Sequence, residues 1–309
     1  MTAGGAAVEP LVHIKDFRMD FGDTRVINDL SFDVRAGETF GFLGSNGSGK
    51  TTTLRALLGI YQPTAGTLHI GGKTFDPRDG IRLGYLPEER GLYKKEQVLD
   101  VMAYFGRLKG LGKAQARTWS LEYLERVELA DKAGTRLDKL SGGEQQKIQL
   151  GVTIMNEPEL LILDEPTKGF DPVNRRLLMD IIEEQKLAGS TVIMVTHQME
   201  EVERLCDRVI LLKDGTSRAY ATVSEVQEQF GGTVYRIVYS GVLPASELYE
   251  ITASGEGSAD LAPRDGADET AVLRELINAG VAVRSFTTER VSLEEIFIRV
   301  YGAKETAVA

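Results

Sequence analysis

The sequence has little cysteine, little histidine and no long apolar run. Only one of its 309 residues is a cysteine, Cys206, so no disulfide can form within the chain, and a reducing compartment fits. We expect Cys206 to be a small buried hydrophobe. No stretch approaches the roughly 20 apolar residues that a membrane-spanning helix needs. The opening MTAGGAAVEP has no basic segment followed by an apolar run, so we do not expect a signal peptide.

Positive charge is also scarce. Lysine and arginine number 36 against 46 aspartates and glutamates, which gives a net charge of -10 and a pI near 5.0. This balance disfavours a nucleic-acid partner held by phosphate neutralisation, although a local basic patch could hide in the average. The hydrophobic content of 42% and the charged content of 27% are ordinary for a globular protein of one large or two medium domains.

Three regions of different character follow one another along the chain. We expect residues 1–10 to be a mobile tail, residues 11–216 to form an α/β domain and residues 217–309 to form a small α+β domain. Short apolar alternations in residues 11–42 predict antiparallel strands, and spacings of three and four predict a helical block at about 92–157. The apolar runs LLILDEP and STVIMVTH, each followed by a helix, indicate a sheet that is parallel in its centre.

In the last region we expect a strand at 231–241, a helix at 271–280, a strand at 281–289 and a helix after Ser292. Residues 254–270, SGEGSADLAPRDGADET, are polar, acidic and rich in glycine, and predict a loop.

The segment GSNGSGKT matches the pattern G-x-x-x-x-G-K-[ST] between a predicted strand and a predicted helix. Glycines let backbone N–H groups turn inward around phosphate oxygens, and the helix start adds its positive end. Lys50 would place a charge at the β- and γ-phosphates, and the Thr51 hydroxyl is a hard oxygen ligand for Mg²⁺. We predict a triphosphate site made of Gly44, Ser45, Asn46, Gly47, Ser48, Gly49, Lys50, Thr51 and Thr52.

In the run LLILDEP, the apolar residues predict a buried strand with Asp164 and Glu165 at its carboxyl end, where ligands bind in such sheets. Asp164 suits Mg²⁺ through water, and Glu165 suits a base that polarises an attacking water. Further on, LSGGEQQK fits a capping box between Ser141 and Glu144, so a helix should start there. Its two glycines would expose bare backbone amides, which is an anion site at a helix start.

In this order, the motifs resemble the nucleotide-binding domain of ATP-binding cassette (ABC) proteins, over about residues 11–215. The resemblance implies a P-loop NTPase of the ABC-cassette fold, with an antiparallel β subdomain, a parallel core and a helical subdomain, binding ATP and Mg²⁺. It implies that LSGGEQ acts across a dimer and closes on the ATP held by the other subunit, through Ser141, Gly142 and Gly143.

Other positions match the family residue by residue. Phe21 fits the aromatic that stacks on adenine, Asp171 in KGFDP fits the loop near the dimer seam, and His197 fits the switch histidine that bonds the γ-phosphate. Glu88 in YLPEERGLY stands where the family usually has the glutamine of the Q-loop, a variant similar to that of exporter subunits. A carboxylate is a stronger Mg²⁺ ligand than an amide, so we expect Glu88 to reach the metal. Its neighbours Glu89 and Arg90 are either a solvated loop or a contact with a permease.

The resemblance implies an ATPase whose cycle moves a separate transmembrane permease. One cassette implies a homodimer, or a heterodimer with a similar chain. The expected location is cytoplasmic, on the inner face of the cell membrane, with membrane contact only through the permease and no nucleic-acid partner. Residues 217–309 resemble the C-terminal extension of ABC-2-type exporter subunits, which favours export, and a role for them in dimerisation is a hypothesis.

Two other functions stay open. One is an ABC ATPase acting on nucleic acid or ribosomes, although such proteins usually carry two cassettes or long coiled-coil insertions. The other is a regulatory switch that closes on ATP without turnover, against which Glu165 and His197 both argue.

Overall fold

The computed structural model describes residues 10–89, 91–264 and 266–302. The predicted mobile tail falls on residues 1–9 apart from Pro10, and these nine residues, like Arg90, lie outside the described part. The chain divides into two compact units, the first ending at Ala221 and the second beginning at Thr222. The expected boundary after residue 216 falls within strand β9 (Thr216–Thr222), because this strand extends the sheet of the first unit beside β8 (Arg208–Lys213).

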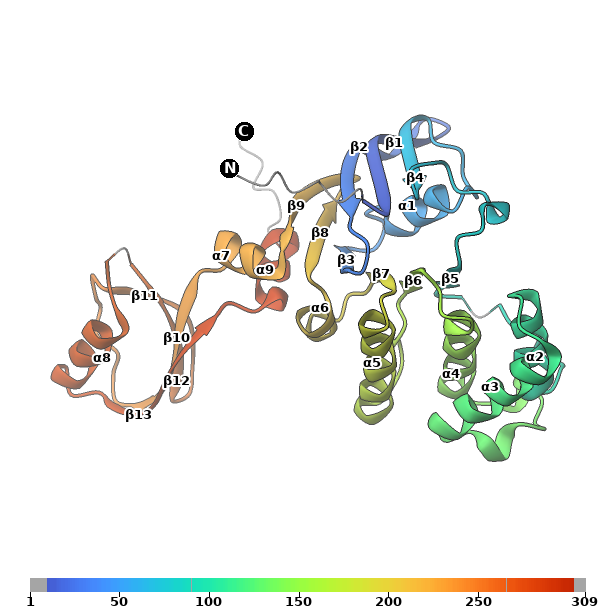
Figure 1. The fold of residues 1–309 in the computed structure, drawn as a ribbon. Helices are drawn as coiled ribbons and strands as arrows, with labels where there is room; N and C mark the ends of the chain where they lie inside the picture. Colours follow the sequence, from blue (N-terminus) through green and yellow to red (C-terminus); the bar gives the residue numbers. More distant parts are fainter. Residues whose placement is uncertain (1–9, 90, 265, 303–309) are drawn as a thin grey trace, which may run out of the picture. The chain divides into compact units, whose positions relative to one another are not determined.

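A six-stranded sheet forms the centre of the first unit, with the strand order β5-β6-β7-β3-β8-β9 (Figure 1). Its four inner pairings, from β5 to β8, are parallel, which confirms the predicted α/β core. Every residue of β6 and β7 is buried, as expected of parallel strands covered on both faces. The strands not yet given bounds are β3 (Thr39–Gly44), β5 (Leu83–Leu86), β6 (Leu160–Asp164) and β7 (Thr191–Val195).

A second, antiparallel sheet has the order β2-β1-β4, with β1 at Val12–Phe21, β2 at Thr24–Val34 and β4 at Ala65–Ile70. We expected the strands of residues 11–42 to be antiparallel throughout, and for the last of them this was wrong. The segment Thr39–Gly44 is β3 of the parallel sheet. All six of its residues are buried, so it lacks the alternating exposure of a half-buried antiparallel strand.

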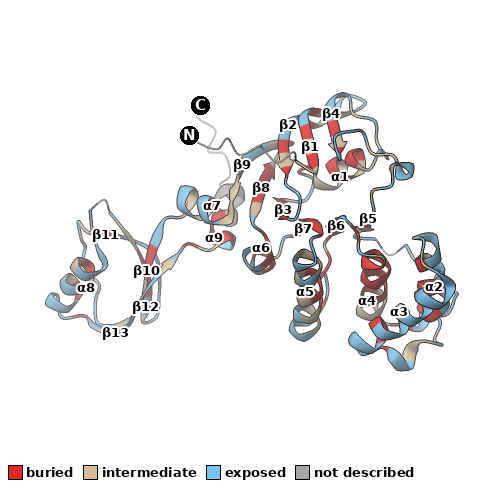
Figure 2. Ribbon diagram, viewed as in Figure 1, coloured by how far each residue is buried: buried red, intermediate tan, exposed pale blue. Residues whose placement is uncertain are grey.

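The helices of the first unit differ in how deeply they are buried (Figure 2). Helices α2, α3 and α4 contact one another and form the helical block expected at about 92–157. Among the described residues, no helix has the length and apolar character needed to cross a bilayer. The bounds are α1 (Lys50–Leu57), α2 (Val98–Leu108), α3 (Lys113–Arg126), α4 (Gly142–Ile154), α5 (Pro172–Leu187) and α6 (Met199–Leu205), with short 3₁₀ turns at Pro77–Asp79, Ala130–Lys132 and Leu137–Lys139.

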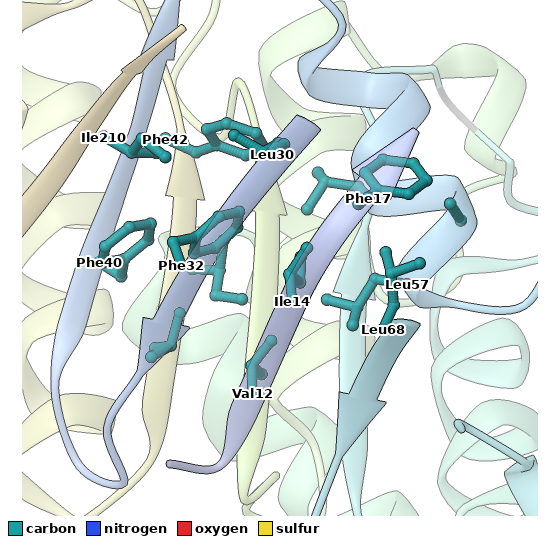
Figure 3. Close-up of a cluster of buried hydrophobic side chains, with 14 of the residues drawn as sticks. Val12, Ile14, Phe17, Leu30, Phe32, Phe40, Phe42, Leu57, Leu68 and Ile210 are labelled. Carbon is teal, nitrogen blue, oxygen red and sulfur yellow. The ribbon is translucent and has the colours of Figure 1, made fainter. Parts of the chain in front are cut away.

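A hydrophobic core of the first unit draws on both sheets and on α1 (Figure 3). Phe32 of β2 stacks on Phe40 of β3 with ring centroids 5.3 Å apart, and Leu57 of α1 belongs to the same cluster. Burying a side chain of this size contributes about 1.5–3 kcal/mol. This packing fixes the start of α1 relative to β3 and so sets the geometry of the loop between them.

The second unit is a four-stranded antiparallel sheet in the order β11-β12-β10-β13, with its own core. Tyr235 and Ile237 of the sheet pack with Val272 and Leu276 of α8. The elements are α7 (Val223–Phe230), β10 (Thr233–Ser240), β11 (Tyr249–Gly255), β12 (Ser258–Pro263), α8 (Glu269–Asn278), β13 (Ala282–Arg290) and α9 (Leu293–Gly302).

The prediction of a loop over 254–270 was wrong for its first half, which holds the end of β11 and all of β12. Ala259 and Leu261 are buried and lie opposite Ile237 and Tyr235 of β10. Only two residues of this strand are buried, and the proline at its end and the polar residues around it are typical of a loop. Gly257, with a φ of +79°, closes the hairpin in the left-handed region that favours glycine.

Helix α4 crosses α3 at a point where only glycine fits. A Cβ on Gly151 would lie 2.4 Å from the ring of Tyr123, whose hydroxyl donates a hydrogen bond to the carbonyl of Lys147 at 2.7 Å. We predict that Gly151→Ala lowers the free energy of unfolding by about 1–3 kcal/mol in urea denaturation, because overpacking outweighs the better helix propensity of alanine. The control is Gly134→Ala, which meets open space. Equal stability of the Gly151 variant would mean that the ring moves aside freely.

Candidate functional site

The predicted phosphate-binding loop runs from the end of β3 to the start of α1. Gly47 and Gly49 have φ values of +80° and +105°. A Cβ on Gly49 would lie 2.2 Å from Cδ1 of Ile27, and one on Gly44 would lie 2.5 Å from the carbonyl oxygen of Leu212. Both dihedral and steric limits therefore require glycine in this loop.

The Lys50 side chain folds back over the loop. Its Nζ donates to the carbonyl oxygens of Gly44 and Ser45 at 2.7 and 3.0 Å. Burial lowers the pKa of the ammonium, and the carboxylates of Glu165, Asp164 and Glu88 oppose that shift. An anionic phosphate oxygen is a stronger acceptor than a neutral carbonyl, so the ammonium is placed to exchange these partners for a phosphate.

Asp164 ends β6 inside the site and is 2% exposed. Its Oδ2 accepts from the Thr51 hydroxyl at 3.4 Å. Burial, followed by the charges of Glu88 and Glu165, raises the pKa of this carboxyl to about 6. A buried carboxyl crowded by other carboxylates favours a nearby cation.

The donor set fits Mg²⁺. Thr51 and Asp164 supply a hydroxyl and a carboxylate oxygen, which are hard ligands of the kind this ion prefers. Within the described ranges, no group of three or more histidine, cysteine, aspartate or glutamate side chains could hold a metal on its own. A magnesium ion held by these two side chains would need phosphate and water oxygens to complete its shell.

Glu165 and His197 lie in direct contact. The His197 Nδ1 is 2.8 and 2.9 Å from the two carboxylate oxygens of Glu165. Glu165 has a φ of +52°, in the left-handed region, and its N–H donates to the carbonyl of Val195 at 2.8 Å. The Glu165 side chain is 12% exposed and the His197 side chain 53%, so the pair faces the open side of the site.

Glu88, expected to reach Mg²⁺, contacts a different cation in this structure. Its carboxylate accepts a hydrogen bond from the Nζ of Lys168 at 2.6 Å, and this contact raises the pKa of the lysine. Both side chains line a pocket of about 630 Å³ that also includes Glu89 and Gly169. The metal contact of Glu88 stays a prediction.

The start of α4 carries Ser141, Gly142 and Gly143. The capping box is confirmed: the Glu144 N–H donates to the Ser141 Oγ at 3.3 Å, and the Ser141 N–H donates to the Glu144 carboxylate at 2.7 Å. A Cβ on Gly143 would lie 3.3 Å from the ring of Phe170. The ring thus occupies the space beside the second glycine.

Two further predicted residues contact neighbours of their own. Phe21 ends β1, is 45% exposed and meets Tyr61 edge to face with ring centroids 5.4 Å apart. Asp171 caps α5, where its carboxylate accepts from the N–H groups of Val173 and Asn174 at 3.0 Å each. Charge interactions place Lys50, Asp164, Glu165 and Glu88 in one neighbourhood. Hydrogen bonds add Thr51 to Asp164 and His197 to Glu165. The contacts recorded for Phe21, Ser141 and Asp171 in the described chain are with other residues.

Sequence reasoning missed three residues that support the site: Tyr61, Lys168 and Glu201. Glu201 is buried and bonds to threonines that flank Glu165 and His197. It stands four residues after His197, on the helix α6 that follows that loop, and this proximity was the only local signal. Lys168 and Tyr61 gave no local signal, because their partners lie far away in the sequence.

We predict that Gly49→Ala displaces the loop and weakens ATP binding about tenfold or more. A loss of only about 1.4 kcal/mol of binding free energy corresponds to a factor of ten in affinity. The reason is the combination of a left-handed φ and the 2.2 Å clash with Ile27. Titration with a fluorescent ATP analogue measures it. Gly37→Ala is the control, because its φ of +77° carries the same backbone strain with no atom within 4 Å. Equal affinities for the two variants would contradict the steric argument.

Known proteins resemble this chain in sequence and in fold. A family model described as ABC transporter matches residues 27–168, and one described as the C-terminal domain of DrrA1-3-like ATP-binding proteins matches residues 222–301. The uncharacterized ABC transporter ATP-binding protein YhaQ of Bacillus subtilis is 35% identical over 92% of this chain and 96% of its own. The Nod factor export ATP-binding protein I of Ralstonia nicotianae is 35% identical over 96% of each chain.

Among solved structures, an ATP-binding subunit of an ABC transporter matches with a TM-score of 0.66 and 28% identity, over 71% of this chain and 93% of that one. The sequence likeness extends over nearly the whole chain, and the structural likeness covers most of it. This chain therefore belongs to the ABC transporter family, as one of its ATP-binding subunits.

Proposed function

We propose that this ATP-hydrolysing ABC subunit works as a dimer that closes on two ATP molecules and drives export through a separate transmembrane permease. The observation that carries the proposal is the convergence of Lys50, Asp164, Glu165 and His197. They stand at or just beyond the carboxyl ends of β3, β6 and β7, which are neighbours in one parallel sheet. Ligands of such sheets bind at this edge.

In the proposed reaction, the loop amides and Lys50 hold the β- and γ-phosphates. Thr51 and Asp164 would hold Mg²⁺, which when bound neutralises charge on the phosphate oxygens. Glu165 orients and polarises the attacking water, and His197 donates a hydrogen bond to the γ-phosphate. Their contact at 2.8 Å fixes the position of each relative to the other.

The proposed dimer is supported by residues whose recorded hydrogen bonds, within the described chain, do not involve their own chain's phosphate loop. The helix start at Ser141, Gly142 and Gly143 presents backbone amides without Cβ atoms in front of them, which suits a phosphate of the partner chain. Asp171 would lie near the seam between the two chains. The exposed ring of Phe21, backed by Tyr61, suits stacking on adenine.

Export and a membrane partner are supported by the relatives and by the surface. The Ralstonia relative is named for export, and the second unit matches the C-terminal domain of ATP-binding proteins. Tyr93, Tyr104 and Leu108 are 56%, 45% and 64% exposed on and beside α2. Exposed apolar clusters of this kind mark protein contacts. We place the subunit on the cytoplasmic face of the cell membrane, held there by the permease.

Glu165→Gln tests the reaction. The amide cannot take a proton from water, so we expect phosphate release to fall about 100-fold or more. ATP affinity should stay within about threefold, because the phosphate loop lies on other elements. Light scattering with ATP should show the dimer accumulating, since hydrolysis no longer reopens it.

The matched control for this variant is Glu122→Gln, on the exposed side of α3. Retained turnover in the Glu165 variant would remove Glu165 from the chemistry. Absence of turnover in the unmutated chain, even together with its permease, would favour the regulatory switch.

Glu88→Gln tests the metal contact. We expect ATPase activity within about tenfold and a higher half-saturating Mg²⁺ concentration, because an amide oxygen is the weaker ligand. Lys168→Gln should lower that concentration, since it frees the Glu88 carboxylate from its 2.6 Å partner. Magnesium titrations of phosphate release measure both. Complete loss of activity would make Glu88 an essential acid, and unchanged titrations would mean that it never reaches the metal.

A further inference from the structure

A buried carboxylate joins the two loops that carry Glu165 and His197. Glu201 lies on α6 and is 1% exposed. The Thr167 hydroxyl donates to its Oε1, and the Thr196 hydroxyl donates to its Oε2 at 3.1 Å. Thr167 follows Glu165 by two residues, and Thr196 directly precedes His197. One side chain therefore ties the segment after β6 to the segment after β7.

The hydrogen-bond pattern defines the direction of each bond. The Thr196 Oγ1 accepts from the Gln198 N–H at 3.0 Å, and its single proton goes to Glu201. The Thr167 hydroxyl donates to the other oxygen, so both Glu201 oxygens accept a hydrogen bond. Burial raises the pKa of Glu201, while the two threonine donors and Arg175 oppose this shift. The Arg175 Nε lies 3.9 Å from Oε1, and this atom is buried without a hydrogen bond in the described chain, although the side chain as a whole is 28% exposed.

The backbone at Glu165 needs such an anchor. Its φ of +52° lies in a region that residues with a Cβ avoid, and such conformations persist only where the surroundings hold them. The Lys168 N–H closes the turn onto the Glu165 carbonyl at 3.2 Å. Thr167 is inside this turn and 2% exposed, so its bond to Glu201 holds the turn from the protein interior.

We propose that Glu201 is a positioning residue for ATP hydrolysis, which holds the turn of Glu165 and the loop of His197 at the spacing that lets those two side chains meet. The inference rests on the proposed roles of Glu165 and His197. The hydrogen bonds of Glu201 do not involve the phosphate loop. Loss of Glu201 should therefore lower the turnover rate and leave the affinity for ATP unchanged. Through Arg175, whose N–H donates to the Asp171 carbonyl at 2.9 Å, the same carboxylate adjoins the start of α5.

Glu201→Gln in the purified full chain tests this inference. The amide keeps the shape but replaces one acceptor oxygen with a donor, so the proton of one threonine hydroxyl loses its acceptor on residue 201. We expect kcat to fall about tenfold or more with KM for ATP within about threefold. Thr196→Val, which removes only the hydroxyl, should reproduce the loss. Glu200→Gln, an exposed carboxylate on the same helix, should leave both constants unchanged.

A double-mutant cycle separates positioning from simple structural support. In a His197→Ala background, Glu201→Gln should reduce kcat by less than about threefold, because the contact between Glu165 and His197 that Glu201 maintains is already lost. Thermal unfolding of each variant shows whether the protein is folded at the assay temperature. Unchanged kcat in folded Glu201→Gln and Thr196→Val, an equal loss in the His197→Ala background, or a rise in KM that accounts for the loss, overturns the inference. Retained turnover in Glu165→Gln instead contradicts the proposed function.

Discussion

The parallel register of β3, β7 and β6 is the constraint on which the site depends. Val195 of β7 lies opposite both Phe42 of β3 and Asp164 of β6, so the three strands end at one edge of the sheet. The strands are buried on both faces and cannot slip by one residue without exposing or burying the wrong atoms. The loop before α1, the Asp164 carboxylate and His197 therefore lie at one edge of the sheet although they are far apart in sequence.

This convergence concentrates negative charge. Asp164, Glu165 and Glu88 all act on one another or on Lys50 through space, and the raised pKa of Asp164, at about 6, reflects both burial and that repulsion. A positive charge that belongs to none of the sequence motifs partly compensates this negative charge: the Nζ of Lys168 lies 2.6 Å from the Glu88 carboxylate. Because both are about half exposed, water screens the pair and it adds little stability. Its effect lies in where the Glu88 carboxylate points.

Sequence patterns could locate only those segments of the candidate site whose residues are consecutive along the chain. Gly44–Thr51 and the run ending in Asp164 and Glu165 were predictable, because glycines, a lysine and a buried strand each act locally. The pairing of Glu88 with Lys168 joins residues 80 apart, and that of Thr167 with Glu201 joins residues 34 apart, which only the folded chain reveals. Strand β3 was misassigned for the same reason, since its partners are distant. Strand β12 was missed because it buries only Ala259 and Leu261 among polar neighbours.

The contact between Glu165 and His197 requires both side chains to be held in place, and Glu201 holds the backbone segments that carry them. Both side chains must face the open side of the site, where any group that held them from the front would compete with water and nucleotide. Anchoring the backbone from behind avoids this competition, and a buried carboxylate with two hydroxyl donors is stiff because leaving either donor unpaired in the interior is costly. A strained Glu165 backbone and a buried acid with an adjacent arginine would each be unfavourable alone. Together, the Glu165 turn and the buried Glu201 hold the Glu165 and His197 side chains in one arrangement. Such a fixed arrangement is what placing a water molecule against a phosphate requires.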